Sequence, residues 1–298
     1  MTVQNKPLGS FANGTFSQGG EDGILREIFG RLEIEHGSFC EFGAWDGKYL
    51  SNTYYFCKNG WSGWYIEGNE SKYEDLKKNI TQPNIDKICA YVMPSGENTL
   101  DNLLKRSKLY KEKSIEELDL LSIDIDSDDL AIWKSVNAFR PKVVIIEFNP
   151  TIPIDVFFEN PPGESKGNSA RAIYDYALSA GYGLVAAIGC NLIFVDKSVG
   201  APHFTFLEID DPSLGLGDRF FFGYDGSLIV QRTGKGARHS VPELIRVPWS
   251  GMRFAQPVDR IFRSHDLNRI TRRLSHLLSR VRIALFHPLH SLREKTYK

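Results

Sequence analysis

Four acidic residues stand at or near the ends of short apolar segments of this chain. They are Glu41 in Ser38-Phe39-Cys40-Glu41-Phe42, Glu67 after Trp64-Tyr65-Ile66, Asp124 after Leu120-Leu121-Ser122-Ile123, and Glu147 after Val143-Val144-Ile145-Ile146. Carboxylates accept hydrogen bonds from hydroxyl groups, bind hard cations and take up protons. The chemistry open to this chain therefore depends on whether its secondary structure brings these four groups together.

Residues 38–68 have the order strand, glycine-bearing turn, helix and second strand closing on an acid. An open α/β sheet builds a nucleoside site in this order. Gly43 has no Cβ to block the approach of a ligand to the backbone, and the Glu67 carboxylate can accept hydrogen bonds from both ribose hydroxyls. The alternative is an ordinary strand-turn-helix whose acids cap the helix.

The turn differs from a dinucleotide-binding fingerprint. That fingerprint reads G-x-G-x-x-G and places a pyrophosphate on the helix N-terminus, whereas here Gly43 and Gly47 are separated by three residues. Asp46, just before the helix, disfavours a pyrophosphate and suits an ammonium group. S-adenosylmethionine has a ribose, a cationic sulfonium and a zwitterionic tail but no phosphate, so we expect it as the ligand.

The wider pattern alternates strands and helices, which predicts parallel strands joined by right-handed crossovers. Helices are expected over 20–33, 51–59, 70–79, 99–106, 128–136 and 170–180, and strands begin near Ser38 and Trp61 and cover 85–92, 120–124 and 142–147. Parallel strands end at the same edge of a sheet, where open α/β sheets bind ligands. We therefore expect Glu41, Glu67, Asp124 and Glu147 to gather at that edge.

The later segments are a long loop, a helix and two hairpins. Residues 148–168 are rich in Pro and Gly, which indicates either a lid or binding loop or a mobile surface insertion. Ser169 is the expected N-cap of the following helix. Strands are expected over 184–188 and 192–195, and a second hairpin over 220–231 surrounds Asp225-Gly226.

Charge divides the chain into an acidic body and a basic end. Residues 251–298 hold 11 Lys and Arg against 3 Asp and Glu, while the whole 298-residue chain has a net charge of −1. Residues 266–286 have the pattern of a basic amphipathic helix. This tail is expected to dock on the acidic body or a second subunit, or else to lie on an anionic membrane; nucleic acid is least favoured because the helix has almost no aromatic residues for stacking.

The compartment expected from the sequence is the cytoplasm, with peripheral membrane contact if the tail binds lipid. The polar, glycine-rich N-terminus lacks the apolar core of a signal peptide, and the longest apolar runs are too short to span a bilayer. The four cysteines have no partners at metal or redox spacing, so we expect reduced thiols.

The motifs together resemble the FkbM-type branch of class I S-adenosylmethionine-dependent methyltransferases, over about residues 15–196. They are Ser17-Gln18-Gly19-Gly20-Glu21-Asp22, Glu41-Phe42-Gly43-Ala44-Trp45-Asp46-Gly47, Ser51-Asn52-Thr53, Gly60-Trp61 to Ile66-Glu67, Ile123-Asp124-Ile125-Asp126 with Asp129, and Gly189-Cys190-Asn191-Leu192-Ile193-Phe194-Val195. Trp45 stands where many methyltransferases have glycine, and Ser122, Asp126 and Ser127 depart from the residues that relatives often show.

The resemblance implies a Rossmann-like sheet of seven strands with one antiparallel late strand. It also implies O-methylation of a sugar, glycan or secondary metabolite. Together with the charge division, we expect a methyltransferase domain over 1–250 followed by the basic tail at 251–298. The alternatives are N- or carboxyl-methylation, or an inactive binding module. The cofactor-binding residues implied are Gln18, Glu41, Gly43, Ala44, Asp46, Gly47, Asn52, Glu67 and Gly68.

Asp124, Asp126 and Glu147 are the expected catalytic residues. An alcohol must lose its proton during methyl transfer, so one of these carboxylates would act as a base, or the three would hold Mg²⁺. Asp128 and Asp129 are more simply explained as N-terminal residues of the next helix.

Overall fold

The computed structural model describes residues 6–113, 116–214 and 216, together with the strands 219–222, 228–232 and 243–247. The chain divides into two compact units, Met1–Gly217 and Asp218–Lys298. The expected helix at 266–286 lies outside the described residues, and the expected boundary at residue 250 stays a prediction.

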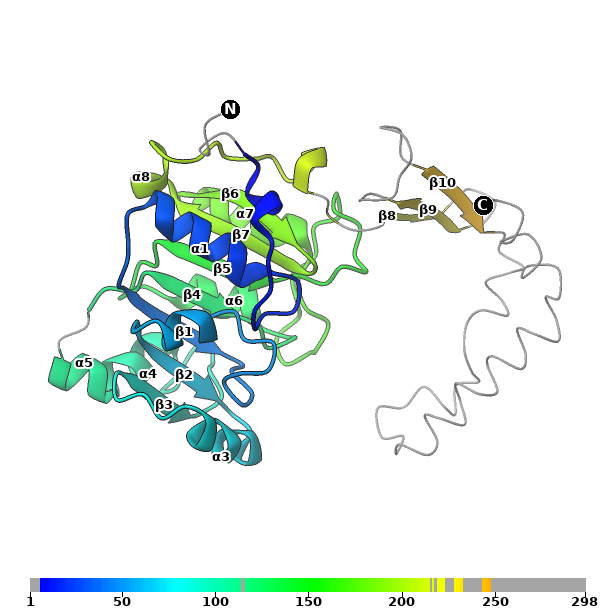
Figure 1. The fold of residues 1–298 in the computed structure, drawn as a ribbon. Helices are drawn as coiled ribbons and strands as arrows, with labels where there is room; N and C mark the ends of the chain where they lie inside the picture. The colour runs from blue at the N-terminus through cyan, green and yellow to red at the C-terminus, as the bar shows by residue number, and fades with distance from the viewer. Residues whose placement is uncertain are drawn as a thin grey trace. The chain divides into compact units, whose positions relative to one another are not determined.

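The first unit is built on a seven-stranded sheet (Figure 1). Its strands are β1 (Ser38–Phe42), β2 (Ser62–Glu67), β3 (Ile85–Cys89), β4 (Leu120–Ile123), β5 (Val143–Glu147), β6 (Tyr182–Ile188) and β7 (Asn191–Asp196). Their order is β3-β2-β1-β4-β5-β7-β6; the first five are mutually parallel, and β7 is antiparallel to both β5 and β6. The predicted α/β sheet with one antiparallel late strand is confirmed.

Helices cover both faces of the sheet (Figure 1). The helical elements are the 3-10 turns η2 (Leu8–Phe11) and η3 (Pro212–Leu214), and the helices α1 (Glu21–Arg31), α2 (Tyr54–Lys58), α3 (Glu70–Asn79), α4 (Leu100–Arg106), α5 (Lys108–Lys113), α6 (Asp129–Ser135), α7 (Ala170–Ser179) and α8 (Lys197–Gly200). One buried cluster packs α1, α2 and α3 on the sheet, and a second packs α4, α6 and α7 on the opposite face. Burial on both faces explains why these strands are continuously apolar.

Side-chain caps fix several of the predicted helix starts. The side chains of Asn69 and Ser169 accept hydrogen bonds from the third residue after them, at the starts of α3 and α7. The helix expected from residue 51 begins only at Tyr54, because Ser51 to Thr53 donate hydrogen bonds to a buried carboxylate. The strand expected over 85–92 ends at Cys89, where its partner β2 also ends. The short helix α5 was not predicted.

The second unit contains an antiparallel sheet of three strands in the order β10-β9-β8. They are β8 (Arg219–Phe222), β9 (Leu228–Arg232) and β10 (Glu243–Val247). The β8–β9 pairing confirms the hairpin predicted around Asp225-Gly226, and β10 is an addition to it. Among the described residues, no helix has the length and apolar character needed to cross a bilayer.

Candidate functional site

A pocket of about 640 Å³ opens at the carboxyl ends of β1 to β4. Its volume lies within the range of small-molecule sites in proteins. Residues at and after the ends of these strands line it. They are Glu41, Gly43, Ala44, Trp45, Tyr49 and Leu50, then Ile66 to Gly68, Ala90 to Met93, and Asp124 to Asp128. The pocket therefore lies where the strand pattern placed a ligand site.

Glu67, the last residue of β2, lines this pocket. Its Oε2 accepts a hydrogen bond from the backbone N–H of Trp45 at 2.8 Å, and its Oε1 accepts one from Asn69 N–H at 2.7 Å. A carboxylate has about four acceptor positions, so two positions remain for a ligand. The two backbone donors fix the carboxylate against the turn after β1.

The β3 side of the pocket is aromatic and apolar. The ring of Tyr91 lies on the backbone of Gly68, since a Cβ added there would come within 2.3 Å of the ring. Tyr91 is 67% exposed and Met93 45% exposed, although both are large side chains. Neither residue was predicted to belong to the site, yet both follow the end of a parallel strand, which is the signal that identified the acids.

Glu41 also lines the pocket, but its carboxylate already accepts hydrogen bonds from other residues of the protein. Ser51 Oγ donates to Oε2 at 2.7 Å, Thr53 Oγ1 donates to the same oxygen, and Asn52 N–H donates to Oε1 at 3.2 Å. Burial raises the pKa of Glu41 despite these three donors. Glu41 thus fixes the segment between β1 and α2.

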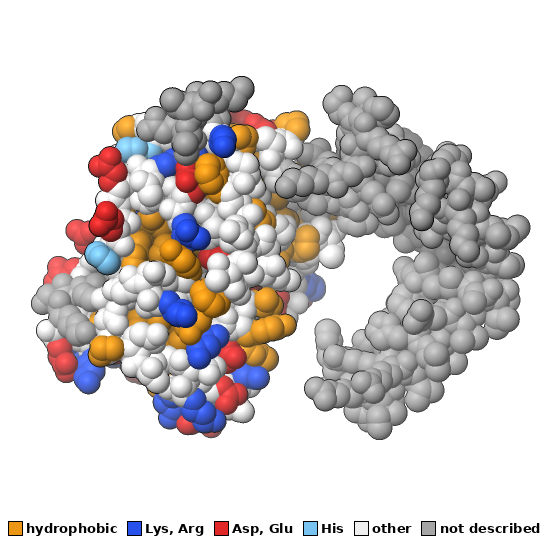
Figure 2. Space-filling view, viewed as in Figure 1, with side chains coloured by type: hydrophobic (Ala, Val, Ile, Leu, Met, Phe, Trp, Pro, Cys, Tyr) orange, Lys and Arg blue, Asp and Glu red, His pale blue; other side chains and the backbone are white. Residues whose placement is uncertain are grey.

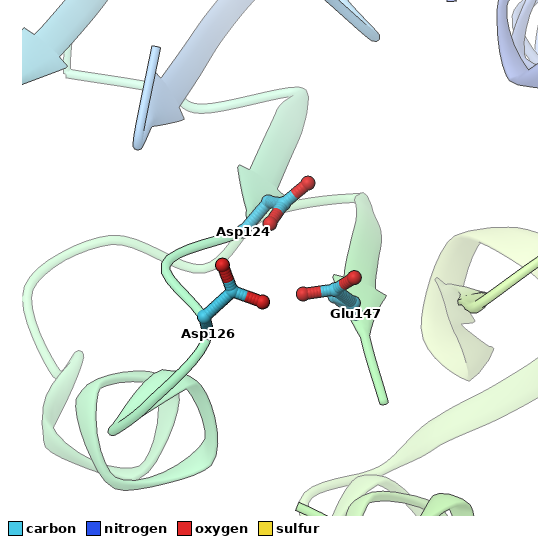
Figure 3. Close-up of side chains that lie close together, drawn as sticks. All are labelled: Asp124, Asp126 and Glu147. Atoms are coloured by element: carbon cyan, nitrogen blue, oxygen red, sulfur yellow. The ribbon is translucent and has the colours of Figure 1, made fainter. Parts of the chain in front are cut away.

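Asp124, Asp126 and Glu147 come together at the ends of β4 and β5 (Figure 3). One carboxylate oxygen from each lies within 4.8 Å of the others, and the three side chains project into a common space. Burial first, and the charge of Asp124 second, raise the pKa of Glu147 to about 8. The pKa of Asp124 is also raised, mainly because surrounding protein displaces water from it. The structure thus brings these three acids together, and their catalytic or metal-binding role stays a prediction.

A buried carboxylate holds the loop that carries two of these acids. Asp129, the first residue of α6, accepts hydrogen bonds from the N–H groups of Ile125 and Ser127, each at 2.9 Å. The loop includes Asp126 in the left-handed region, with φ of 61°, a conformation that costs a non-glycine residue about 1–3 kcal/mol. Asp129 compensates by pairing the backbone groups on both sides of that residue.

Two polar contacts beside the acids come from distant parts of the sequence. The Cys190 thiol donates to Glu147 Oε1 at 3.2 Å, and burial raises its pKa to about 12. Asn191 Nδ2 donates to Glu21 Oε1 at 3.0 Å, and Glu21 contributes to the raised pKa of Asp124. Glu21 belongs to one of the motifs that carry the family resemblance, but no site role was expected for it. Its hydrogen bond with Asn191 joins two distant segments, so neither segment alone predicts it.

Four expected cofactor residues do not line the pocket. Asp46 Oδ1 instead accepts the backbone N–H groups of Lys48 and Tyr49, at 2.9 and 2.7 Å. Asn52 is buried, with its amide donating to Ser122 Oγ at 3.1 Å. The other two are Gly47, which lies close to Leu76 of α3 and to Ile80 just after it, and Gln18, which is exposed.

Gly43 lines the pocket, together with Ala44 and Gly68, but its missing Cβ serves the protein itself. With φ of 76°, a Cβ at this position would lie 1.8 Å from the carbonyl oxygen of Asp124. The close approach is therefore between two loops of the chain, after β1 and β4. This differs from the expectation that the glycine makes room for a ligand.

No family model matches the chain, and the search of curated proteins found no match. Among solved structures, the chain is similar to TrmK from M. capricolum in complex with S-adenosyl-homocysteine (12% identity, TM-score 0.37, covering 64% of this chain and 74% of TrmK). It is also similar to a SAM-dependent methyltransferase from Aquifex aeolicus (12% identity, TM-score 0.36, covering 63% of this chain and 94% of that one). A third similar structure is a putative O-methyltransferase from Klebsiella pneumoniae (9% identity, TM-score 0.38, covering 65% of this chain and 92% of that one).

Proposed function

We propose that the pocket binds S-adenosylmethionine and that the protein is a methyltransferase. The observation that carries this proposal is Glu67, which lines the pocket with the exposed Tyr91 and whose carboxylate has acceptor capacity beyond its two backbone donors. A diol on the carboxylate and a flat base among apolar side chains is the arrangement that a nucleoside requires. Bound there, the cofactor would supply an electrophilic methyl group.

The acidic group at the ends of β4 and β5 supports transfer to a hydroxyl. Asp124 or Glu147 would accept the proton of the acceptor, and positioning of the two reactants is worth about 7–11 kcal/mol in such a reaction. In the second form of the proposal, Asp124, Asp126 and Glu147 would hold Mg²⁺, which prefers carboxylate oxygens. The spacing of their oxygens, within 4.8 Å, fits either role.

The acceptor is proposed to be a sugar, glycan or secondary metabolite hydroxyl. A polyhydroxylated molecule offers many hydrogen-bond donors, which matches a surface formed by the carboxylates of Asp124, Asp126 and Glu147. The same charge would attract an amine, so N-methylation is the second candidate. Both are consistent with a small-molecule or glycan partner, and the FkbM-type branch remains the proposed subfamily.

Isothermal titration with S-adenosylhomocysteine tests the cofactor proposal. Glu67→Gln removes the negative charge from a carboxylate proposed to accept two hydroxyl donors, and hydrogen bonds to charged groups contribute about 1.5–3 kcal/mol. We expect affinity to fall roughly 10- to 100-fold. Glu70→Gln, on the exposed first turn of α3, is the matched control and should bind normally. Equal affinity for both variants would refute the assignment of Glu67.

A further inference from the structure

Several cationic side chains of the first unit lie over aromatic rings, and four of them are Arg26, Lys48, Lys58 and Lys72. The distances from the charged group to the ring centroid are 4.6 Å for Arg26 on Tyr55, 5.7 Å for Lys48 on Tyr54, 5.7 Å for Lys58 on Phe16 and 4.1 Å for Lys72 on Trp45. A cation held over a ring is attracted by the electrons of that ring without being neutralised. Each of these groups therefore keeps its charge for an external anion.

Three of these cations lie over aromatic rings that are in contact or belong to adjacent residues. Phe16 and Tyr54 contact each other edge to face, with centroids 4.7 Å apart, and Tyr54 is followed on α2 by Tyr55. Lys48 and Lys58 thus lie over two rings that are in contact, and Arg26 lies over the ring of the next residue along α2; we call these three side chains the cationic face. Figure 2 shows Lys and Arg side chains following one another down the side of the molecule that presents α1, α2 and α3.

The cationic face has no carboxylate partner. Among the residues that the structure describes, none of its three cations lies within 4.0 Å of an acidic oxygen, whereas Lys77 and Lys78 of α3 are paired with Glu74 and Asp75 at 2.7 and 3.2 Å. The nearby Asp46 directs an oxygen to the backbone N–H groups of its own turn. The surface is therefore positively charged and open to an anionic partner.

Large apolar side chains are exposed beside these cations. Tyr49 is 67% exposed and Leu50 is 41% exposed, and both directly follow Lys48 in the chain. Trp45, under Lys72, is 48% exposed. Basic side chains next to exposed tyrosine and leucine are typical of proteins that lie at a membrane surface, where the charges meet lipid phosphates and the apolar groups enter the headgroup region.

The arrangement favours a lipid surface over single-stranded nucleic acid. Nucleic-acid platforms stack bases on open aromatic faces, but Phe16, Tyr54 and Tyr55 are each covered by a cation, and none of the three is exposed. We propose that the cationic face binds anionic phospholipid bilayers, with Tyr49 and Leu50 at headgroup level. Because Tyr49 and Leu50 also line the pocket, its mouth would then border the bilayer.

Vesicle flotation with the full-length protein tests this proposal. The probes are phosphatidylcholine vesicles with and without 30% phosphatidylglycerol, in low salt and in about 0.5 M NaCl, which screens surface charges. The variant Arg26→Ala/Lys48→Ala/Lys58→Ala removes the cationic face. The control Lys77→Ala/Lys78→Ala/Lys134→Ala removes three ion-paired lysines and so changes the net charge equally.

We expect the wild-type protein to float with anionic vesicles in low salt only, and the face variant to bind them on the order of 100-fold more weakly. The control variant should bind within a few-fold of wild type. Equal losses in the two variants would mean that net charge alone drives binding. No loss in the face variant would assign any membrane contact to another part of the chain, such as the basic tail. A face variant that loses affinity for a 15-nucleotide single-stranded RNA but not for vesicles would assign the surface to nucleic acid. Each of these three results overturns the proposal.

Discussion

Replacing Gly43 by alanine tests whether this glycine serves the fold or the ligand. The residue has a φ of 76°, and an added Cβ would lie 1.8 Å from the Asp124 carbonyl oxygen. The substitution therefore has two effects: backbone strain in the left-handed region, and an overlap between the loops after β1 and β4. Gly96 provides the matched control, since its φ is 85° and nothing lies within 4 Å of its added Cβ.

The two effects have different sizes at the two positions. Left-handed backbone costs alanine about 1–2 kcal/mol relative to glycine, and this cost applies to both variants. The overlap applies only at Gly43 and adds about 1–3 kcal/mol, as for other overpacked sites. Replacing glycine by alanine also lowers the conformational entropy of the unfolded chain, which favours the folded state. This contribution is the same in both variants and cancels when they are compared. We expect Gly43→Ala to lose about 2–5 kcal/mol of unfolding free energy, and Gly96→Ala about 1–2 kcal/mol.

Urea denaturation of the two variants, followed by circular dichroism, measures this difference directly. Titration with S-adenosylhomocysteine under folding conditions should show weaker binding by Gly43→Ala, because the turn after β1 contacts both the Asp124 backbone and the Glu67 carboxylate. If Gly43→Ala were as stable as Gly96→Ala while losing cofactor affinity, the glycine would serve ligand approach, and overlap between the two loops would be the wrong explanation for it.

Three further changes probe the acids and one ion pair. Asp124→Asn should abolish methyl transfer while leaving S-adenosylhomocysteine affinity within a few-fold of wild type. A fully active variant would remove Asp124 from the mechanism. Wild-type turnover that is unaffected by EDTA would exclude the magnesium form of the proposal. Asp129→Ala leaves two partly buried N–H groups unpaired and should cost about 2–4 kcal/mol in urea denaturation, with Asp129→Asn costing less; equal losses would count against the loop-holding role. Burial opposes ionisation of Asp196, but hydrogen bonds from Arg140 and Ser198 hold its pKa below the usual value. Their stabilisation is present at neutral pH and is lost as pH falls below about 4, so Arg140→Leu should lower stability by about 1–2 kcal/mol at pH 7 and by less at pH 3.

The elements that position the site were predictable because their signals are local. The run Val143–Ile146 is buried on both sides, and such runs read as parallel strands. The helix expected over 70–79 has those bounds, and the Asn69 side chain caps its start. Parallel strands then force their carboxyl ends to one edge, so the meeting of Asp124 with Glu147 followed from strand type alone.

What could not be predicted is the direction in which each polar side chain turns. The position of Asp46 in the sequence suggested an ammonium ligand. In the structure its Oδ1 instead accepts hydrogen bonds from the backbone N–H groups of Lys48 and Tyr49 in the same turn. Asn52 lies behind the pocket because its amide reaches a strand 70 residues later. Glu21 and Asn191 are 170 residues apart and form a buried hydrogen bond, which depends on the packing of α1 on the sheet.

Hydrogen bonds from the chain distinguish Glu41 and Asp129 from the acidic group of Asp124, Asp126 and Glu147, while Glu67 combines two backbone donors with a place in the pocket lining. Glu41 accepts three donors of the chain and Asp129 accepts two backbone N–H groups, so their oxygens already hold loops in place. Within the described part of the chain, no backbone N–H donates to Asp124, Asp126 or Glu147, and the donor that Glu147 receives from outside this acidic group is a thiol. One oxygen of each of these three acids lies within 4.8 Å of the others, and negative charges held this close disfavour full ionisation of the group. We expect a proton or a cation to relieve this repulsion, which is what the proposed base or magnesium site requires.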